Sequence, residues 1–501
     1  MVELVVARNT IDTSDQIDLV PAYQKCFVLN GSNIKVADFI NTRLTHTALA
    51  TPHKRNDLLT QDQGGGKHAY MLVDTMYGSS TRTLGFAYYD GGATAFDTSN
   101  VVTSNGTGSS FTPTAVQPSP LWYDWVVFND DTTDYGTMPD TAYIGCLYRG
   151  RLVLSGNTKS PTQWYMSMVG NPWKFLYDPT NDGPLSAVSF SNTRVGEVGD
   201  IITALIPYKD DLLIFGGANS IWMLVGDPLA GGQLAQVTEA TGIYGPKSWC
   251  IDNNNNLYFL GSDGLYKMPV SANFTPPENI SAVVLPNLVS DWALNKALHR
   301  VTMTFDPLNY GILISRVDVT SGVNSNYWFD LVTGGFYPES YPAEDAPYSM
   351  LYYPALDSNY KSLLIGCKDG YIRKFDVDSK SDNVGSTSEA ITSYVGMLEQ
   401  LAEDDNTFGK LEKVSSVISL DSDAVAWSAY RGKDAESVLS QMQLGDTPFI
   451  TGSWTGTGKQ DWNRVRLRGV WAGLKLGNTI KDKSWTVEKL MADIMPAGKG
   501  R

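Results

Sequence analysis

A repeated alternation of apolar strands and polar turns occupies residues 142–378. In each instance an apolar strand ends at a polar turn, a second apolar strand follows, and a third, aromatic strand comes after another turn. The turns are rich in Asn, Asp and Gly, which accommodate tight strand connections. The instances cover residues 143–168, 202–228, 248–270, 301–338 and 348–376. This pattern predicts a mainly β protein made of short antiparallel strands.

The repeat has a length typical of β-propeller blades. The central positions of the second strands lie 60, 45, 55 and 51 residues apart, at Leu152, Leu212, Leu257, Ile312 and Leu363. A repeat of about 40–50 residues with several short strands predicts a propeller, in which neighbouring blades cover the sheet faces that one blade leaves open. A further unit at residues 69–96 would make six. We predict a propeller of about five to six blades over residues 69–380, with a sandwich carrying long insertions as the alternative.

The first 68 residues depart from this rhythm and are predicted to form an N-terminal arm or docking hairpin. Asn30 and Gly31 lie between two apolar runs, which indicates a hairpin with a type I′ turn. Residues 36–44 fit either a helical stripe or a bulged strand. Residues 51–68 contain three consecutive glycines and are predicted to be a loop.

A low-complexity stretch interrupts the predicted propeller at residues 99–120. It is rich in Ser, Thr, Gly and Pro and cannot bury enough apolar area to offset its ordering entropy. We expect a surface loop, or a segment held in place by its neighbours.

Beyond residue 380 the pattern changes, and residues 381–501 are predicted to form a β-rich platform domain with a basic tail. Residues 378–388 are rich in Ser, Asp and Gly and are predicted to be a linker. A short helix is expected at residues 434–442, and residues 463–476 and 483–494 are expected to be mostly strands.

Charge is distributed unevenly along the chain. The net charge of the 501 residues is −15, of which the first 385 carry −14, whereas residues 459–501 carry +6. An acidic body disfavours tight non-specific DNA binding, which needs many Lys and Arg side chains against phosphates. It is compatible with a wall past which DNA slides, because like charges prevent adhesion.

The clearest candidate contact residues are Arg464, Arg466 and Arg468. Alternation along one strand places these three guanidinium groups on one face and two apolar residues on the other. Three interpretations remain open: a solvated sheet face, a contact with an acidic neighbouring subunit, and a contact with DNA.

No residue pattern indicates a catalytic, cofactor or metal site. The four histidines (His46, His53, His68 and His299) lack metal-ligand spacing and are expected to be ordinary surface or loop residues. The stretch at residues 64–67 resembles part of a phosphate loop but lacks its full spacing. Paired aspartates stand beside turn residues, where they cap the backbone, and aromatic stretches such as residues 122–125 are expected to pack in the core or at interfaces.

Cysteine usage and hydropathy predict assembly in a reducing compartment, without membrane insertion. Cys26, Cys146, Cys250 and Cys367 form no CxxC pair and are expected to be buried thiols. No stretch approaches the roughly 20 apolar residues that would span a membrane, and the start MVELVVARNT is a poor secretory signal.

Four strings in the repeated region resemble a known family. They are RGRLVLSGNTKSPTQWYMSMVGNPWKF (residues 149–175), GDIITALIPYKDDLLIFGGANSIWMLVGDPLAGG (199–232), GIYGPKSWCIDNNNNLYFLGSDGLYKM (242–268) and LLIGCKDGYIRKFD (363–376). Together they resemble propeller-containing tail proteins of tailed bacteriophages, most nearly the tail nozzle of short-tailed phages. The resemblance covers residues 140–380 well and the two ends of the chain less well.

This resemblance implies a non-enzymatic structural subunit of the virion tail, assembled in the host cytoplasm. Copies, commonly six in that family, would form a ring below the portal and adaptor proteins, retain and conduct the packaged DNA without specific binding, and offer a docking surface for tail fibres. A neck or baseplate hub protein is the alternative within this class. A carbohydrate-active or glycan-binding propeller is the alternative outside it.

Overall fold

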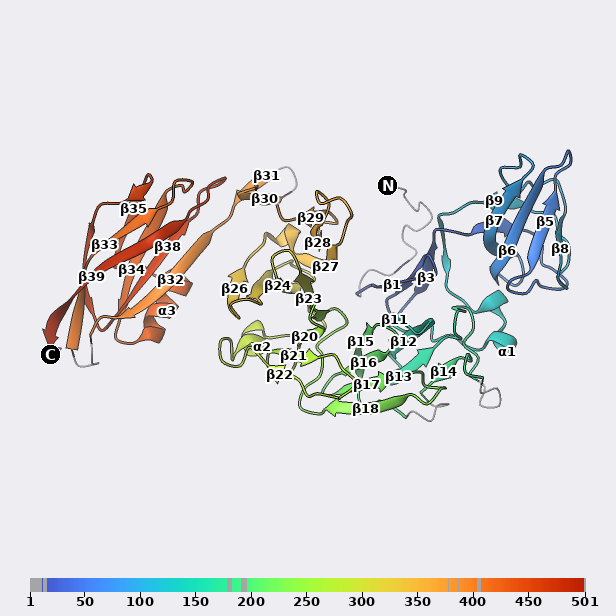
Figure 1. Ribbon diagram of the computed structural model, residues 1–501, viewed down its shortest axis with the longest axis horizontal. Helices are drawn as coiled ribbons and strands as arrows, with labels where there is room; N and C mark the ends of the chain where they lie inside the picture. Colours follow the sequence, from blue (N-terminus) through green and yellow to red (C-terminus); the bar gives the residue numbers. More distant parts are fainter. Residues whose placement is uncertain are drawn as a thin grey trace. The chain divides into compact units, whose positions relative to one another are not determined.

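The computed structural model describes residues 11, 16–177, 183–190, 196–376, 378–384, 387–402 and 407–499. The fold is mainly β, with many small antiparallel sheets (Figure 1). The chain divides into two compact units. The first runs to Thr320 and adds Asn324–Glu339 and Pro347–Tyr352; the second comprises Ser321–Val323, Ser340–Ala346 and the chain from Tyr353 onward.

Five four-stranded antiparallel sheets follow one another in the first unit. Sheet one contains β1 (Asp18–Ala22), β2 (Lys25–Leu29), β3 (Ile34–Asp38) and β10 (Leu121–Asp124). Sheet two contains β11 (Ile144–Tyr148), β12 (Arg151–Asn157), β13 (Ser160–Met166) and β14 (Val188–Ser189). Sheet three contains β15 (Ile202–Tyr208), β16 (Leu212–Gly217), β17 (Ile221–Val225) and β18 (Gln233–Thr238).

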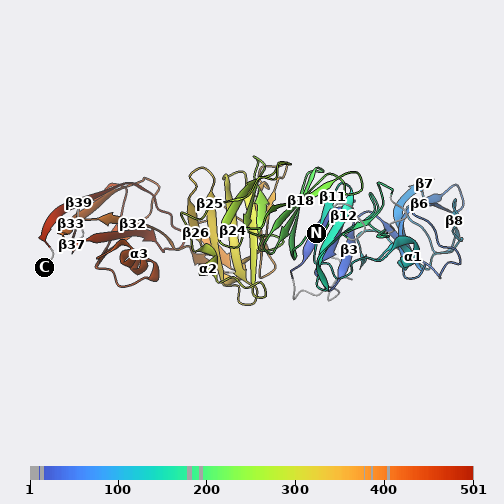
Figure 2. The ribbon, with the colours of Figure 1, turned by 90° about the horizontal axis from the view of Figure 1, so that it is seen from below.

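Two further sheets continue the series, and Figure 2 labels β24, β25 and β26 of the second of them. Sheet four contains β19 (Trp249–Ile251), β20 (Asn256–Leu260), β21 (Leu265–Pro269) and β22 (Glu278–Asn279). Sheet five contains β23 (His299–Asp306), β24 (Gly311–Asp318), β25 (Asn324–Asp330) and β26 (Phe336–Glu339). β27 (Pro347–Tyr353) lies almost entirely in the first unit, and the hairpin of β28 (Ser362–Cys367) and β29 (Ile372–Lys374) lies in the second.

The predicted repeat anchors occupy equivalent places in this series. Leu152, Leu212, Leu257, Ile312 and Leu363 lie in the second strand of their sheets, and all are buried. Separate apolar clusters fill the space between sheets two and three, three and four, and four and five. Stacked four-stranded sheets of this kind are typical of propeller blades. The repeat found in the sequence therefore corresponds to individual sheets of the structure.

An N-terminal arm is not confirmed. Residues 18–38 form the first three strands of sheet one. Its fourth strand, β10, pairs with β3 and follows it in the sequence after a long insertion. The hairpin predicted at Asn30 and Gly31 joins β2 to β3, with Gly31 at φ +82°. It is a four-residue connection rather than a two-residue type I′ turn, because Leu29 pairs with Ile34 and residues 30–33 lie between them. The Asn30 side chain accepts hydrogen bonds from the backbone N–H groups of Ser32 and Asn33.

The insertion forms a six-stranded sheet in the order β8-β5-β6-β7-β4-β9. Its strands are β4 (Thr42–Thr45), β5 (Leu58–Asp62), β6 (His68–Tyr77), β7 (Arg82–Asp90), β8 (Val102–Ser104) and β9 (Ala115–Gln117). Residues 69–96, predicted as a sixth blade, therefore belong to this sheet instead. The low-complexity stretch 99–120 supplies β8 and β9, held by pairing with β5 and β4. The predicted boundary at residue 68 falls at the start of β6.

The second unit contains a two-sheet sandwich. One sheet has the order β32-β38-β34-β35, and the other has β36-β33-β37 with β39 also paired to β33. The strands are β32 (Ser393–Gln400), β33 (Thr407–Ile418), β34 (Val425–Gly432), β35 (Ile450–Trp454), β36 (Gly458–Lys459), β37 (Asn463–Gly469), β38 (Trp471–Asn478) and β39 (Val487–Lys499). An apolar core that includes Trp427 and Leu467 lies between the sheets. The predicted linker at residues 378–388 contains β30 (Ser381–Val384) and the start of β31 (Thr387–Ala390).

The predicted helix near residue 434 is confirmed as α3 (Ala435–Leu444). Val438 and Met442 face the sandwich and contact Tyr430. The Asp434 carboxylate caps the N-terminus by accepting a hydrogen bond from the Ser437 N–H at 2.8 Å. Gly445 ends the helix at φ +73°, where glycine avoids the Cβ penalty.

Replacing Asp434 by alanine should lower the free energy of unfolding of the second unit by about 1 kcal/mol, because the cap satisfies an otherwise free N–H group. Urea unfolding of the full chain, followed by circular dichroism, measures the change. Asp434→Asn is the control and should cost less, because its side-chain carbonyl still caps. An equal loss in both variants would contradict the capping role.

Candidate functional site

The predicted contact residues Arg464, Arg466 and Arg468 all lie in β37, exposed on the outer face of the sandwich. The intervening Val465 and Leu467 are buried in its core. The predicted alternation is therefore confirmed. What the three arginines contact stays a prediction.

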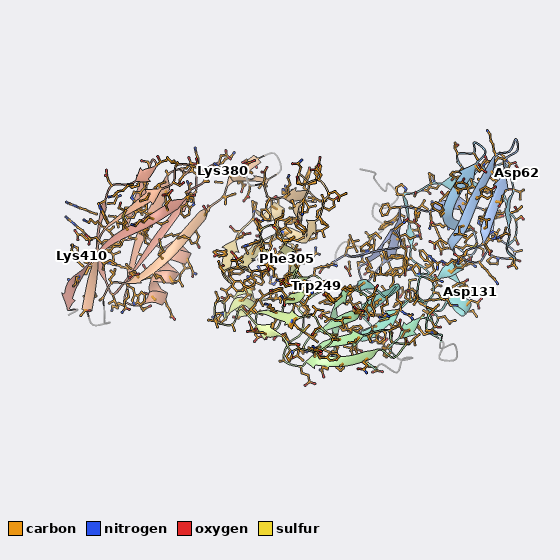
Figure 3. The ribbon with its side chains drawn as sticks, viewed as in Figure 1. Asp62, Asp131, Trp249, Phe305, Lys380 and Lys410 are labelled. Atoms are coloured by element: carbon orange, nitrogen blue, oxygen red, sulfur yellow. The ribbon has the colours of Figure 1, made fainter. Side chains whose placement is uncertain are left out.

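Neighbouring strands extend this face with further cations. In the register of β33 and β37, Lys410 lies opposite Arg468 and Lys413 opposite Arg464, and directly paired residues project from the same side of a sheet. Figure 3 labels Lys410 on this unit. We call the five residues Lys410, Lys413, Arg464, Arg466 and Arg468 the basic face. The lysines were missed because a bulge between Leu411 and Lys413 breaks their alternation.

Two aromatic rings and two carboxylates complete the surroundings of the basic face. The Arg468 guanidinium lies 5.0 Å from the Phe408 ring centre, and the Lys413 Nζ lies 4.8 Å from that of Trp462. Asp493 pairs with Lys413 at 3.3 Å. The second carboxylate is that of Glu412, so two carboxylates lie beside the five cations.

Glu412 is the acidic residue within the basic face. Its carboxylate contacts the Lys410 Nζ at 2.5 Å and the Arg466 Nε at 3.8 Å. The hydrogen bond from Lys410 holds the pKa of the Glu412 carboxyl below its ordinary value, and the nearby arginine charges act in the same direction. Among the described side chains, Arg464 and Arg468 have no carboxylate within ion-pair distance. The face is therefore able to attract an acidic surface.

A second candidate contact surface covers the inserted sheet. Leu58, Leu72 and Phe86 lie directly opposite one another across β5, β6 and β7, and each is at least 38% exposed. Tyr70 and Tyr88 form the next row, with ring centres 6.2 Å apart. Large apolar side chains gathered on one solvent-facing sheet are typical of a protein contact surface.

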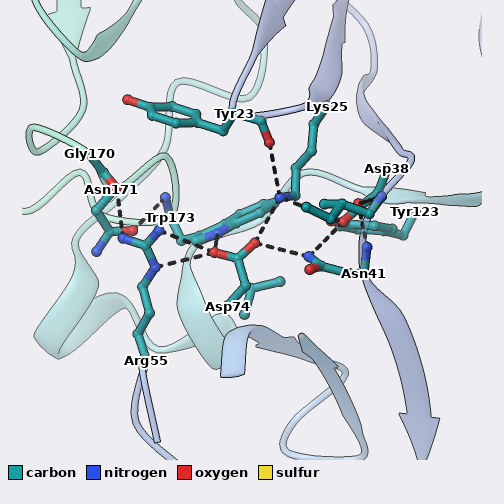
Figure 4. Close-up of polar contacts among 12 residues, drawn as sticks. Tyr23, Lys25, Asp38, Asn41, Arg55, Asp74, Tyr123, Gly170, Asn171 and Trp173 are labelled. Carbon is teal, nitrogen blue, oxygen red and sulfur yellow. Dashed lines mark hydrogen bonds and ion pairs between the residues drawn. The ribbon is translucent and has the colours of Figure 1, made fainter. Parts of the chain in front are cut away.

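A buried polar network ties the insertion to sheet one (Figure 4). The Asp74 carboxylate, in β6, accepts contacts from Lys25 Nζ at 3.0 Å, Arg55 Nη2 at 3.2 Å and Asn41 Nδ2 at 3.0 Å. Lys25 belongs to β2, so the network bridges the two sheets. Burial raises the pKa of Asp74, but the Lys25 and Arg55 charges outweigh burial and leave that pKa below its ordinary value.

The same network includes a second buried carboxylate. Asp38, at the end of β3, accepts hydrogen bonds from the Tyr123 hydroxyl and the Asn41 amide, both at 2.8 Å. The Trp173 indole N–H also points at Asp74, at 3.4 Å. These partners satisfy the charges, so the network fixes the orientation of the inserted sheet rather than offering a reactive group.

Two of the histidines expected to be surface or loop residues, His46 and His53, lie in loops but are buried. Both histidines lie close to Phe111, with ring centres 4.1 Å (His46) and 5.6 Å (His53) from that of Phe111. Phe111 belongs to the low-complexity stretch, which these rings help to anchor. Within the described parts of the chain, no group of three or more His, Cys, Asp or Glu side chains could hold a metal ion.

A large cavity of about 1260 Å³ opens among sheets one, four and five and β27. Trp249 of β19 and Phe305 of β23 contribute to its walls (Figure 3), together with Trp122 and Tyr348. Its lining is mainly apolar, with Lys247 and Arg300 as the cations. Glycoside hydrolysis ordinarily needs a pair of carboxylates, and none of the described lining residues is Asp or Glu.

Three of the four cysteines are buried, as predicted. Cys146, Cys250 and Cys367 are buried thiols, whereas Cys26 is half-buried. Burial raises the pKa of each of these thiols. None of the helices in the described ranges has the length and hydropathy needed to cross a membrane.

Comparison with known proteins finds no matching family model and no matching curated protein. Solved structures do match. A quinonprotein alcohol dehydrogenase-like protein from Bacteroides thetaiotaomicron is 12% identical, with a TM-score of 0.28 over 66% of each chain. A protein of unknown function from the same organism is 11% identical, with a TM-score of 0.27 over 76% of this chain and 90% of the other.

A third match is a GH74 xyloglucanase from Xanthomonas campestris, which is 11% identical. Its TM-score is 0.28, over 68% of this chain and 52% of the xyloglucanase, so the chain spans about half of that protein. Likenesses at such TM-scores carry no information on the ligands or chemistry of this chain.

Proposed function

We propose that this chain is a structural subunit of a bacteriophage tail, forming the nozzle or tube that continues the DNA channel below the portal and adaptor proteins. Copies of the chain assemble into a ring, of six in the nozzle family, that retains the genome and conducts it during ejection. We infer that the five four-stranded sheets are blades of a propeller. No catalytic step is part of this role.

The observation that carries the proposal is the outward-facing basic face on an otherwise acidic chain. The first 385 residues carry −14 of the total charge of −15, while five cations gather on one side of β33 and β37. When two different surfaces of identical copies attract each other, head-to-tail contacts form, and these close into rings if the rotation permits. Charge complementarity would set the register of each copy on the next.

The same charge distribution suits a channel wall. DNA carries one negative charge per roughly 1.7 Å of its axis, and an acidic lining repels it at short range. Packaged DNA would then pass without adhering. The exposed apolar and aromatic side chains of β5, β6 and β7 form a separate surface for further contacts, such as those with adaptor or fibre proteins.

Reversing the charge of the basic face tests the assembly role. The triple variant Arg464→Glu, Arg466→Glu, Arg468→Glu should abolish ring formation by the purified full chain, measured by sedimentation velocity at about 0.1 M salt. The control reverses three exposed lysines elsewhere in the second unit, Lys361→Glu, Lys433→Glu and Lys481→Glu, with the same change in net charge.

The control should assemble like the unmodified chain, and assembly of both should weaken as salt screens the contact. If the arginine variant forms rings as readily as the control, the basic face does not join the copies.

A further inference from the structure

A second, smaller pocket of about 510 Å³ lies where the N-terminal ends of the first strands of the sheets converge. Tyr143 precedes β11, Thr203 lies in β15, Tyr244 precedes β19 and Arg300 lies in β23. The turn that contains Asn30 closes the remaining side. All five four-stranded sheets of the first unit therefore contribute to one concave site, and concave sites are where small ligands commonly bind.

The charge of this pocket is opposite to that of the chain. Its charged lining residues are Lys296 and Arg300, and none of its described lining residues is Asp or Glu, although the sequence holds 53 acidic residues. Arg300 also reaches the wall of the larger cavity. The pocket thus concentrates positive charge inside an acidic unit.

The two main cations have aromatic rather than acidic partners. The Lys296 Nζ lies 5.7 Å from the Tyr244 ring centre, and the Arg300 guanidinium lies 4.9 Å from that of Tyr348. No described carboxylate lies within ion-pair distance of either cation. Neither positive charge therefore has a described acidic partner. Tyr348 lines the larger cavity and not this pocket, whereas Arg300 lines both.

Asp200 is the carboxylate that acts on Lys296 from a distance, and it is engaged elsewhere. Its Oδ2 accepts the backbone N–H groups of Asn219 and Ser220 at 2.7 and 2.9 Å. Burial lowers the pKa of Lys296 despite the Asp200 charge, and burial likewise lowers the pKa of Arg300. An anion in the pocket would favour the charged forms of both groups.

We propose that this pocket binds a small phosphate monoester of about mononucleotide size, whose phosphate contacts Lys296 and Arg300. A guanidinium and an ammonium group together are well suited to phosphate oxygens. A pocket of this volume lies in the range for small organic ligands, and the Tyr143 and Tyr244 rings can contact the remainder of the molecule. The site is independent of ring assembly.

Calorimetric titration of the full chain tests the pocket with three probes: inorganic phosphate, deoxyadenosine monophosphate and deoxyadenosine. The monophosphate should bind saturably, phosphate more weakly, and deoxyadenosine weakest of all. The variant Lys296→Met, Arg300→Met should weaken monophosphate binding by about tenfold or more, as expected when charged hydrogen-bond donors are removed. Thermal unfolding of the variant verifies that it is folded.

Lys267→Met is the matched control, because the Lys267 Nζ also lies over a tyrosine ring, 5.8 Å from the centre of Tyr258, but lines neither cavity. It should bind like the unmodified chain. Absence of saturable monophosphate binding, equal affinity for deoxyadenosine, or unchanged affinity in the folded double variant would each overturn the proposal. None of these results bears on assembly, which the arginine variants test separately.

Discussion

Replacing Asp74 by alanine is expected to lower the free energy of unfolding of the first unit by about 3–5 kcal/mol, because it leaves buried cations without their carboxylate. Lys25 is 5% exposed, and its other described partners are the Asp38 carboxylate at 4.0 Å and the Tyr23 carbonyl at 3.5 Å, both more distant than Asp74 at 3.0 Å. Urea unfolding followed by tryptophan fluorescence measures the loss, since Trp173 contacts Asp74 directly.

The matched control is Asp124→Ala, which breaks the ion pair between Lys35 and Asp124. That carboxylate is 69% exposed, so its loss should cost about 0–1 kcal/mol. Because the pKa of Asp74 is held low in the folded chain, its contribution should be present above pH 4 and disappear as the pH falls through that lowered value. Equal costs for the two variants would show that the network does not hold the insertion.

Acid is expected to weaken the inserted sheet by roughly 2–3 kcal/mol between pH 6.5 and pH 4, through His53. Burial lowers the pKa of His53 to about 4, the nearby Asp57 charge opposes this, and His46 adds to it. The unfolded chain takes up a proton below about pH 6.5 and the folded chain does not, so each unit of pH in this window costs about 1.4 kcal/mol. Burial also lowers the pKa of His46, which acts in the same direction.

Hydrogen exchange of the backbone amides in β5 and β6 measures the local stability of the inserted sheet as a function of pH. The variant His53→Leu should flatten the pH dependence of protection, whereas His68→Gln, at a half-exposed histidine, should not. Both His53 ring nitrogens lack a hydrogen-bond partner among the described residues, so the leucine should be tolerated. An unchanged pH dependence in His53→Leu would rule out His53 as the source.

The sequence carried enough information to locate most blades but not the insertion. Strand spacing identified the positions of Leu152 and Leu257 in second strands because each sheet is built from consecutive residues. Sheet one was not predicted as a blade, because its fourth strand, β10, follows β3 in the sequence only after the whole six-stranded sheet. The local alternation of residues cannot predict a pairing between residues 35 and 124, which are far apart in the sequence.

The candidate sites differ in the same way: a site within one strand could be predicted from the sequence, and a site built from several sheets could not. Arg464, Arg466 and Arg468 were found because alternation within one strand fixes their face. The phosphate pocket could not be found, because Asn30, Tyr143 and Arg300 meet only through the stacking of separate sheets. Likewise, nothing in the local sequence of His53 indicates that Phe111 covers it.

Locating this chain in intact virions by cryo-electron microscopy tests the central claim most directly. The proposed role predicts repeated copies of its stacked sheets arranged in a ring around the tail axis, below the portal and adaptor, with β37 at the junction between copies. Purified virions that lack the chain, or density that places a single copy away from the tail axis, would contradict it.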